Sequence, residues 1–428
     1  MSRPSGRFNL QPSLAAASAA LALVFLLTVL AVPAAPAQTE TFRVIHHFTA
    51  GLDGSTPYAG LTIDRSGNLY GTSYYGGGGP CNDNFGIGCG TVFQLKHKES
   101  GWTLNPLYKF TGNGNNDGAY PAARVIFGPD GALYGTTIGG AGNGTVFNVR
   151  PSGTACISVL CPWKESVLYI FTGGADGAFP FLGDLVFDPA GTLYGTTIEG
   201  GFNGQGVVYK LSPSAGGWTQ NVLYSMVAAI SGYFPYGGVI FDRAGNLYGT
   251  ASTGGAYNYG TVYQLTPSGA SWTENTVYSF RNEGDGSVPI SGLTLDQSGK
   301  LYGATAGVPG ATVFELTPSS KWTLNVLYSF SANPNEGPYD GPNDRLLMDA
   351  AGNLYGTAYG GGAYGRGVVF ELTPSDGGWT YTDLHDFSGN DDGAYPIGGV
   401  VQDANGNIYG TASEGGQYGG GVVWEITP

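Results

Sequence analysis

The stretch Pro235-Tyr-Gly-Gly-Val-Ile-Phe-Asp-Arg-Ala-Gly-Asn-Leu-Tyr-Gly-Thr250 holds two short apolar runs on either side of a turn. Its Leu-Tyr-Gly triplet, or an Ile-Tyr-Gly variant, recurs seven times in the 428 residues. The glycines that close the triplets are Gly71, Gly135, Gly195, Gly249, Gly303, Gly356 and Gly410. Their separations of 64, 60, 54, 54, 53 and 54 residues, filled by strand-like and turn-like segments, are typical of a β-propeller.

Each repeat is predicted to form four short strands joined by turns. In the fourth copy the strands run from Pro235 to Asp242, Leu247 to Thr250, Thr261 to Leu265 and Trp272 to Phe280. The last of them alternates, which predicts a common face for Trp272, Glu274, Thr276, Tyr278 and Phe280. In the third copy, the run that begins at Pro180 is one residue longer, which predicts a bulge.

The two ends of the chain complement each other. Residues 40–48 align with a fourth strand, with Phe48 matching Phe280, whereas the C-terminus follows a third strand at residues 422–426. In a closed ring the N-terminal strand would complete the last blade, and closure removes exposed sheet edges. We therefore predict an all-β fold in which residues 38–428 form one propeller of seven four-stranded blades.

Residues 1–37 have the features of a signal peptide. Arg3 and Arg7 form a basic start, Leu14 to Val32 is apolar or small, and Ala35-Pro-Ala37 offers small residues for cleavage. An uncleaved membrane anchor is the alternative, since the apolar run approaches the ~20 residues that span a bilayer. With cleavage after Ala37 no second long apolar run remains, so we predict a secreted, periplasmic or cell-surface protein without a membrane span.

The composition limits the classes of partner. The formal net charge of −14 would repel phosphate backbones and anionic lipid surfaces, which makes nucleic acid an unfavourable partner. The 75 glycines and the charged fraction of 11% resemble a disordered chain, but an aromatic content of 13% and regular apolar alternation favour a packed β protein.

The four cysteines form two close pairs, Cys81 with Cys89 and Cys156 with Cys161. Each pair falls in an insertion relative to the other repeats. In an exported protein the oxidising environment would favour a disulfide within each pair. A metal site is the alternative, but neither pair has a Cys-x-x-Cys spacing or a nearby histidine. We predict two disulfides and no metal site at the cysteines.

The repeat carries a family resemblance. Its pattern is Asp-x-x-Gly-Asn-Leu-Tyr-Gly-Thr, then Gly-Gly, then Gly-x-Val-Phe-x-Leu-Thr-Pro, then Trp and Leu-Tyr-Ser-Phe, shown best at residues 242–280 and 349–387. This pattern resembles the Gloeo_Verruco (GloVer) tandem repeat of exported bacterial proteins, and the likeness covers essentially the whole chain after residue 37. It implies a surface or secreted protein and carries no catalytic residues.

A recurring Asp-Gly pair provides candidate ligand-binding residues. In a propeller the loops from fourth to first strand and from second to third strand share one face around the central channel, and the Asp-Gly pairs lie in the first of these sets. The aspartates are Asp53, Asp117, Asp176, Asp285, Asp340 and Asp392. One hypothesis is a carboxylate ring that holds Ca²⁺ or meets hydroxyl-rich or cationic ligands. The alternative is that each aspartate builds a turn by accepting local N–H bonds.

Tyrosines also stand on the glycine-rich loops between second and third strands, among them Tyr74, Tyr257 and Tyr364. Such side chains offer a flat apolar ring with a polar tip, which suits stacking on sugar rings. The alternative is packing between neighbouring loops. Together with the aspartates they form the predicted binding face.

The sequence contains little that indicates catalysis. Of the four histidines, His46 and His385 occupy an outer position of the fourth strand, and no nucleophile, base and orienting acid can be assembled. We therefore predict a monomeric binding or scaffold propeller, without a cofactor, whose partner is an extracellular polysaccharide or surface protein. The alternative is a glycan hydrolase or lyase at the channel mouth, since a carboxylate pair needs no histidine.

Overall fold

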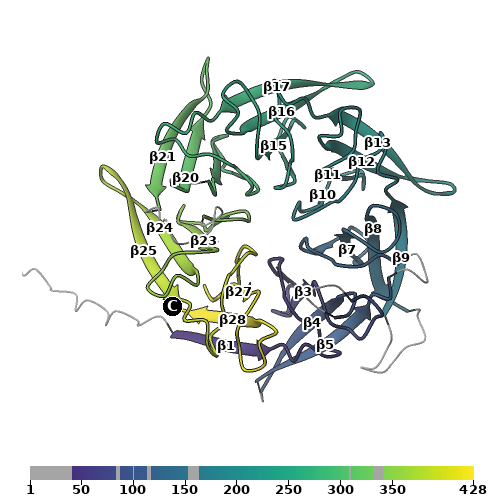
Figure 1. Ribbon diagram of the computed structural model, residues 1–428. Helices are drawn as coiled ribbons and strands as arrows, with labels where there is room; N and C mark the ends of the chain where they lie inside the picture. The colour runs from purple at the N-terminus through teal and green to yellow at the C-terminus, as the bar shows by residue number, and fades with distance from the viewer. Residues whose placement is uncertain are drawn as a thin grey trace, which may run out of the picture. The chain divides into compact units, whose positions relative to one another are not determined.

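The computed structural model describes residues 41–82, 87–99, 101–112, 117–152, 163–307, 310–330 and 341–428. These residues form seven antiparallel sheets of four strands, with no helix among them. The sheets are arranged as the blades of a ring (Figure 1), which confirms the predicted seven-bladed propeller. Within these ranges there is no helix long and apolar enough to cross a membrane.

The first four blades follow the chain in order. Blade one contains β2 (Thr62–Ile63), β3 (Leu69–Ser73), β4 (Thr91–Lys98) and β5 (Gly101–Lys109). Blade two contains β6 (Ile126–Phe127), β7 (Leu133–Thr137), β8 (Thr145–Pro151) and β9 (Trp163–Ile170). Blade three contains β10 (Val186–Phe187), β11 (Leu193–Thr197), β12 (Val207–Ser214) and β13 (Gly217–Ser225). Blade four contains β14 (Val239–Phe241), β15 (Leu247–Ala251), β16 (Thr261–Ser268) and β17 (Ser271–Ser279).

The last three blades complete the ring. Blade five contains β18 (Thr294–Leu295), β19 (Leu301–Ala304), β20 (Thr312–Thr317) and β21 (Thr323–Ser329). Blade six contains β22 (Leu347–Met348), β23 (Leu354–Ala358), β24 (Val368–Ser375) and β25 (Gly378–Asp386). Blade seven contains β26 (Val401–Gln402), β27 (Ile408–Ala412), β28 (Val422–Thr427) and β1 (Thr41–His47).

The N-terminal strand closes the ring as predicted. β1 pairs with β28 in register from Thr41 opposite Thr427 to His47 opposite Val422, and Figure 1 shows the two strands side by side. Phe48 N–H then donates to the Gly421 carbonyl at 3.0 Å, which is the bond that Phe280 makes to Gly260 in blade four. The first and last parts of the described chain are therefore joined in one blade.

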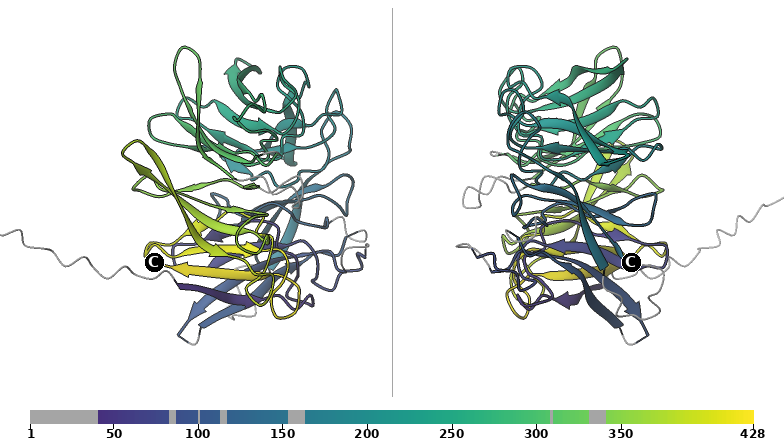
Figure 2. Two further views of the ribbon diagram at one scale, coloured as in Figure 1. Left: turned by 60° about the vertical axis from the view of Figure 1, so that its left-hand side comes forward. Right: turned by 90° about the vertical axis from the view of Figure 1, so that its right-hand side faces the viewer.

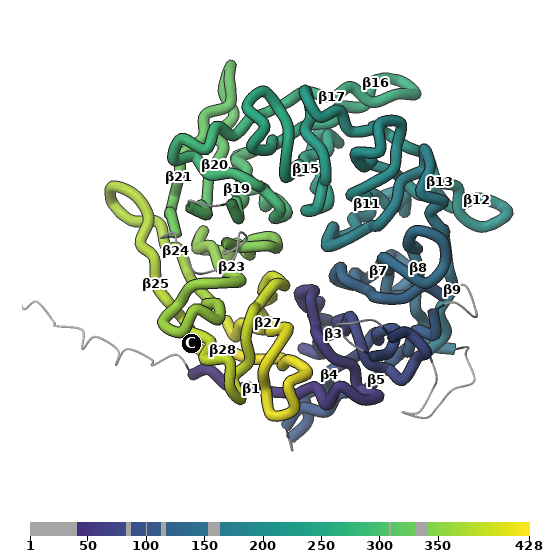
Figure 3. The backbone as a smooth tube through the Cα atoms, viewed as in Figure 1, coloured from purple at the N-terminus to yellow at the C-terminus, as the bar shows by residue number. Residues whose placement is uncertain are grey.

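The backbone trace in Figure 3 shows the order of strands within a blade, with second strands such as β7 and β11 nearer the axis and fourth strands such as β9 and β13 at the periphery. The strand-to-strand turns gather on two opposite faces of the ring (Figure 2). Hydrophobic clusters fill the space between adjacent blades. In one of them Phe280 of blade four meets Phe314 of blade five, with ring centroids 5.3 Å apart.

The Leu-Tyr-Gly triplet is required because its residues contact three different groups. In blade one Leu69 is buried, and the Tyr70 hydroxyl donates to the turn carboxylate of Asp64 at 3.0 Å. A Cβ on Gly71 would lie 2.6 Å from Cζ of Phe93 on the next strand, a distance that real Cβ atoms do not show. The same glycine contact recurs at Gly135, Gly303 and Gly356, each against the aromatic ring of its own third strand.

The predicted strict alternation of the fourth strand is wrong at one position. In blade four Val262 pairs with Tyr278 and Tyr263 pairs with Thr276, so Val277 is an extra residue in a β-bulge. The bulge turns Val277 toward the core, and Phe280 is fully buried whereas Tyr278 reaches the Asp285 carboxylate. Fourth strands in all seven blades carry this irregularity.

The bulge predicted at Pro180 is also absent from the strand pairing. β10 pairs with β11 in regular register, and the extra residue lies before the strand in a tight turn in which Gly183 N–H donates to the Phe181 carbonyl at 2.7 Å. Leu182 at the centre of this turn has a φ of 59°. The extra residue precedes β10, so it does not interrupt the hydrogen bonds between β10 and β11.

Candidate functional site

The two loop sets predicted to share a face do so. In five of the seven blades, the loop from fourth to first strand forms an antiparallel bridge with the following loop from second to third strand. The bridges are Ser55–Tyr75, Ala119–Gly139, Ala178–Glu199, Tyr233–Thr253 and Ala394–Glu414. We call this side of the ring the loop face. It carries the singled-out tyrosines and those of the singled-out aspartates that the structure describes.

In six of the seven blades, a repeated proline packs against a glycine of the blade before it. In blade two Pro121 packs on Gly90 of blade one, where an added Cβ would lie 2.6 Å from the proline Cδ. The preceding residue, Tyr120, has a φ of 60°, and its N–H donates to the Cys89 carbonyl at 2.9 Å. The same left-handed conformation occurs at Thr56, Phe179, Phe234, Val288 and Tyr395. The left-handed residue and the proline together direct the residue after the proline toward the ring axis.

The residue after each proline varies from blade to blade. In chain order these residues are Tyr58, Ala122, Phe181, Tyr236, Ile290, Asn343 and Ile397. All except Ala122 line one cavity of about 610 Å³ on the loop face. We call this cavity the mouth cavity. Because six blades contribute, it lies on the axis of the ring.

The mouth cavity is lined mainly by aromatic and aliphatic side chains. Phe181 and Tyr236 make an edge-to-face contact with ring centroids 6.0 Å apart, and Phe234 lies against Tyr236 at 6.4 Å. Tyr359 from a glycine-rich loop also borders the cavity and stacks on Tyr395 at 4.8 Å. Such walls provide flat apolar surfaces interrupted by hydroxyl groups, a surface that suits a ligand with both apolar and polar parts.

Asn343 is the polar exception in this lining. Its side chain is only 8% exposed, and its Oδ1 atom has no hydrogen-bond partner among the described residues. A buried amide oxygen without a donor costs about 1–3 kcal/mol relative to a satisfied one. A ligand that supplies a hydroxyl or N–H group to Asn343 would recover that energy.

Four charged residues occupy the channel below the mouth. Most blades have a small residue, usually glycine, three positions after the proline, and the first strands are so close there that a Cβ on Gly60 would lie 2.7 Å from the Gly399 carbonyl oxygen. Blades two and six break this pattern with Arg124 and Arg345, and blade three has Asp184 four positions after its proline because its run is one residue longer. Together with Asp344, which precedes Arg345, these residues form what we call the channel cluster.

The channel cluster is held by short polar contacts. The Arg124 guanidinium donates to Asp184 Oδ2, with Nε 3.0 Å away. Asp344 accepts the backbone N–H groups of Arg345 and Gly399, each at 2.6 Å. Burial and then the Asp184 charge raise the pKa of Asp344, whereas Asp184 and Asp344 together overcome the effect of burial and hold the pKa of Arg124 above its usual value. Arg124 therefore stays charged.

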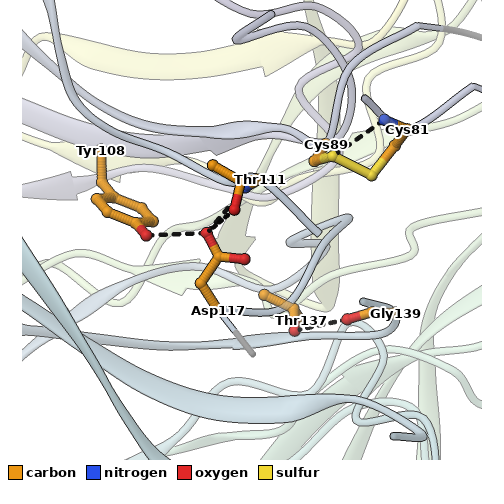
Figure 4. Close-up of a disulfide and its surroundings, with 7 residues drawn as sticks. All are labelled: Cys81, Cys89, Tyr108, Thr111, Asp117, Thr137 and Gly139. Carbon is orange, nitrogen blue, oxygen red and sulfur yellow. Dashed lines mark hydrogen bonds between the residues drawn. A yellow bond between two sulfur atoms is a disulfide. The ribbon is translucent and has the colours of Figure 1, made fainter. Parts of the chain in front are cut away.

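The predicted Asp-Gly carboxylates accept hydrogen bonds from their own loops. Asp117 is 2% exposed and accepts from Tyr108 hydroxyl at 2.9 Å and from Thr111 N–H at 2.8 Å, as Figure 4 shows. Asp176 and Asp285 make the same tyrosine and backbone contacts, and Asp53 and Asp392 accept from a histidine instead of tyrosine. These five lie outside the mouth lining, and Asp340 lies outside the described residues.

The three predicted tyrosines occupy different surroundings. Tyr257 and Tyr364 are 49% and 63% exposed on their loops, and the Arg281 guanidinium lies 5.1 Å from the Tyr257 ring centroid. Tyr74 is half-buried and stacks on Tyr120 at 5.1 Å. The first two are therefore open to a ligand at the rim of the loop face, while Tyr74 packs between neighbouring loops.

The cysteine predictions have different outcomes. Cys81 and Cys89 form a disulfide beside the Asp117 loop (Figure 4), as predicted. Cys156 and Cys161 lie outside the described residues. In the part of the chain that the structure covers, no three His, Cys, Asp or Glu side chains converge as a metal site.

The post-proline residues of the mouth cavity and the residues of the channel cluster were missed in the sequence. Tyr58, Phe181 and Tyr236 follow a repeated proline and were assigned to the apolar first strand. The available signal was the variation of this one position among otherwise similar repeats, together with Arg124 and Arg345 where most copies have a small residue. Reading each position of the repeat across its copies would have found both sets.

Comparison with protein families identifies the repeat. The Gloeobacter/Verrucomicrobia repeat matches residues 162–340 and 309–428. These two overlapping segments cover more than half of the chain. No curated protein matches the sequence.

Several solved structures resemble this chain at low sequence identity. A protein assigned as a 6-phosphogluconolactonase from Bacteroides uniformis is 15% identical, with a TM-score of 0.49 over 79% of this chain and 84% of that one. A protein of unknown function from Dyadobacter fermentans is 13% identical, with a TM-score of 0.45 over 91% of this chain and 98% of that one.

Proposed function

This chain belongs to the Gloeobacter/Verrucomicrobia repeat family, and from that premise we propose that it is an exported binding propeller. In this proposal a hydroxyl-rich ligand, such as the end of a polysaccharide, is held in the mouth cavity. The observation that supports it most is the combination of aromatic walls with the buried, unsatisfied amide of Asn343.

The chemistry of the cavity fits a sugar. A pyranose ring has an apolar face that stacks on aromatic side chains, for which Phe181 and Tyr236 are placed, and equatorial hydroxyls that donate hydrogen bonds to an amide oxygen such as that of Asn343. The volume of about 610 Å³ lies within the range of about 300–1,000 Å³ usual for small-molecule sites. One or two sugar units at a chain end would fill it.

The exposed tyrosines extend this site in the proposal. Tyr257 and Tyr364 stand on the loop face beyond the cavity, where they can contact further units of a longer ligand. Asp53, Asp117, Asp176, Asp285 and Asp392 are given a supporting role, because their carboxylates hold the loops that carry this face. A polysaccharide would then contact a central cavity and a looser rim.

Export is part of the same proposal. The Cys81–Cys89 disulfide favours an oxidising compartment, in which disulfides form and persist. The proposed signal peptide at residues 1–37 lies outside the described residues. A membrane-fractionation experiment with a C-terminal tag would test export, and recovery of the whole pool in the cytoplasm would contradict it.

A glycan array with the chain from residue 38 tests the binding function. We expect binding to one or a few glycans, weakened at least about tenfold by Tyr236→Ala, which corresponds to about 1.4 kcal/mol. Phe202→Ala is the matched control, because Phe202 is 89% exposed on the loop face and does not line the mouth cavity. Equal losses in both variants would contradict a cavity site, and release of shortened glycan would replace this proposal by the hydrolase or lyase alternative.

A further inference from the structure

A second cavity, of about 450 Å³, lies at the other end of the channel. It is lined by first strands β18, β22 and β26 and by the turn that follows β18. That turn joins a first to a second strand, so it lies on the side of the ring opposite the loop face. We call it the far cavity. The channel cluster separates it from the mouth cavity, since Arg124 and Arg345 line the far cavity and Asn343 lines the mouth.

The walls of the far cavity are largely apolar. The first strands of blades four to seven contribute the apolar residues Ile240, Leu295, Leu347, Met348 and Val401. A small pocket of this kind binds ligands through apolar contact and takes its specificity from the few polar groups at one end. Here those groups are the two guanidinium groups of the channel cluster.

The two guanidinium groups differ in their partners. Arg124 is paired with Asp184, and the Asp344 carboxylate is occupied by backbone N–H groups. The Arg345 guanidinium makes no ion pair or hydrogen bond with any residue that the structure describes. Arg124 and then burial lower the pKa of Arg345, which reflects a cation that its surroundings compensate incompletely. A guanidinium group carries five N–H donors, and leaving them unmatched inside a protein is costly.

The acidic residues at the rim do not supply the missing acceptor. Asp296 Oδ1 accepts the N–H groups of Ser298 and Lys300 at 2.8 and 2.9 Å. Asp349 Oδ1 accepts those of Ala351 and Asn353 at the same two distances. Both carboxylates therefore serve their own turns.

We propose that the far cavity binds a small carboxylate with an apolar body, whose two oxygens accept N–H bonds from the Arg345 guanidinium. The planar fork of an arginine matches a carboxylate in two parallel hydrogen bonds. The apolar body then lies against Leu347, Met348 and Val401. A monoanion fits better than a phosphate dianion, because Asp184 and Asp344 are close to the same arginine and repel a second negative charge. This site is independent of the sugar site proposed at the mouth.

Calorimetric titration with hexanoate tests the proposal, with hexanol, hexylamine and inorganic phosphate as comparison ligands. We expect hexanoate to bind and the other three ligands to bind at least about tenfold more weakly. Hexanol has no charge, hexylamine has a positive charge, and inorganic phosphate has no apolar body. Arg345→Gln should weaken hexanoate binding at least about tenfold. Arg243→Gln, which removes the same charge from an exposed turn on the same side of the ring, should leave binding unchanged.

A second variant keeps the test decisive if Arg345→Gln does not fold. Gln297 is an exposed turn residue that lines the far cavity, so Gln297→Trp should obstruct the cavity without disturbing the core. Loss of hexanoate binding in this variant, with retained thermal stability, supports the site. Absence of hexanoate binding to the unaltered protein, tighter binding of phosphate, or full binding in both Gln297→Trp and a folded Arg345→Gln would overturn it.

Discussion

The second strand and the residue after the repeated proline belong to the same repeat in every blade, yet the sequence of the strand is nearly invariant whereas seven blades use five residue types after the proline. The Leu-Tyr-Gly strand contacts its own blade, through Phe93 and Asp64 in blade one. The post-proline residue faces the ring axis, where Tyr58, Phe181 and Asn343 meet a cavity. A residue that is repeated in every blade therefore has the same contact partner within every blade. A residue that varies among blades faces the cavity at the ring axis, where contact with a ligand can determine which side chain is needed.

The largest expected effect tests the invariant side of this comparison. Gly71→Val should lower the free energy of unfolding by at least about 3 kcal/mol, because its Cβ would meet Phe93 at 2.6 Å and Leu61 at 2.8 Å in a filled core. Gly216→Ala is the control, since an added Cβ there meets no atom within 4 Å, and a change within about 0.5 kcal/mol is expected. Denaturant titration measures both, and equal stabilities would contradict this reason for the repeat.

A smaller loss is expected where the repeat has a natural exception. Asp117→Ala should cost about 2 kcal/mol, because it leaves Tyr108 hydroxyl and Thr111 N–H without their acceptor. Asp117→Ser should cost less, since blade four has Ser231 at this position and its Oγ accepts the Val227 N–H at 2.9 Å. Unfolding curves for the two variants decide this, and an equally stable Ala variant would show that the aspartates are not needed for the turn.

The variable side of the comparison predicts a gain in stability. Asn343→Leu removes a buried oxygen without a partner, so the free energy of unfolding should rise by about 1 kcal/mol. The same variant should lose affinity for the glycan, since the amide is the polar group of the mouth cavity. A variant that is destabilised would mean that Asn343 serves the fold, and retained glycan binding would remove it from the proposed site.

The last prediction concerns the pH dependence of stability and a carboxyl group away from the channel, on β9. Burial, followed by the charge of Asp117, raises the pKa of Glu165 to about 8. The folded protein therefore keeps this proton while the unfolded chain releases it near the ordinary value of 4.5, so stability should fall as pH rises from 4.5 to 8. Glu165→Gln should flatten that slope when unfolding is measured at pH 5, 7 and 9. An unchanged slope would show that Glu165 ionises normally.

The fold was predictable because its determinants repeat. A triplet such as Leu69-Tyr-Gly71 is needed in every blade for the same contacts, so the sequence shows the requirement seven times. Closure through residues 40–48 followed from the same alignment. The bulge at Val277 was not predictable from alternation, because it depends on how the fourth strand must bend to follow its neighbour.

The site was less predictable because it exists only when the blades meet. Tyr58 and Tyr236 are 178 residues apart in the sequence and line one cavity, a relation that no local pattern records. The Asp-Gly residues attracted notice through repetition, but Asp117 and Asp285 are directed at the tyrosines of their own fourth strands. The repetition of these aspartates indicated a local turn. The residues that line the cavity come together only in the closed ring, so no local pattern could indicate them.

The pairing of β1 with β28 has a consequence for how the protein matures. Arg43 and Glu425, which form an ion pair across this junction, are 382 residues apart, so the seventh blade cannot be completed until the six blades between them have been made. Until then six blades are framed by two open sheet edges. A chain interrupted before β28 would keep those edges exposed to proteases, so protection of the first blade depends on synthesis of the last.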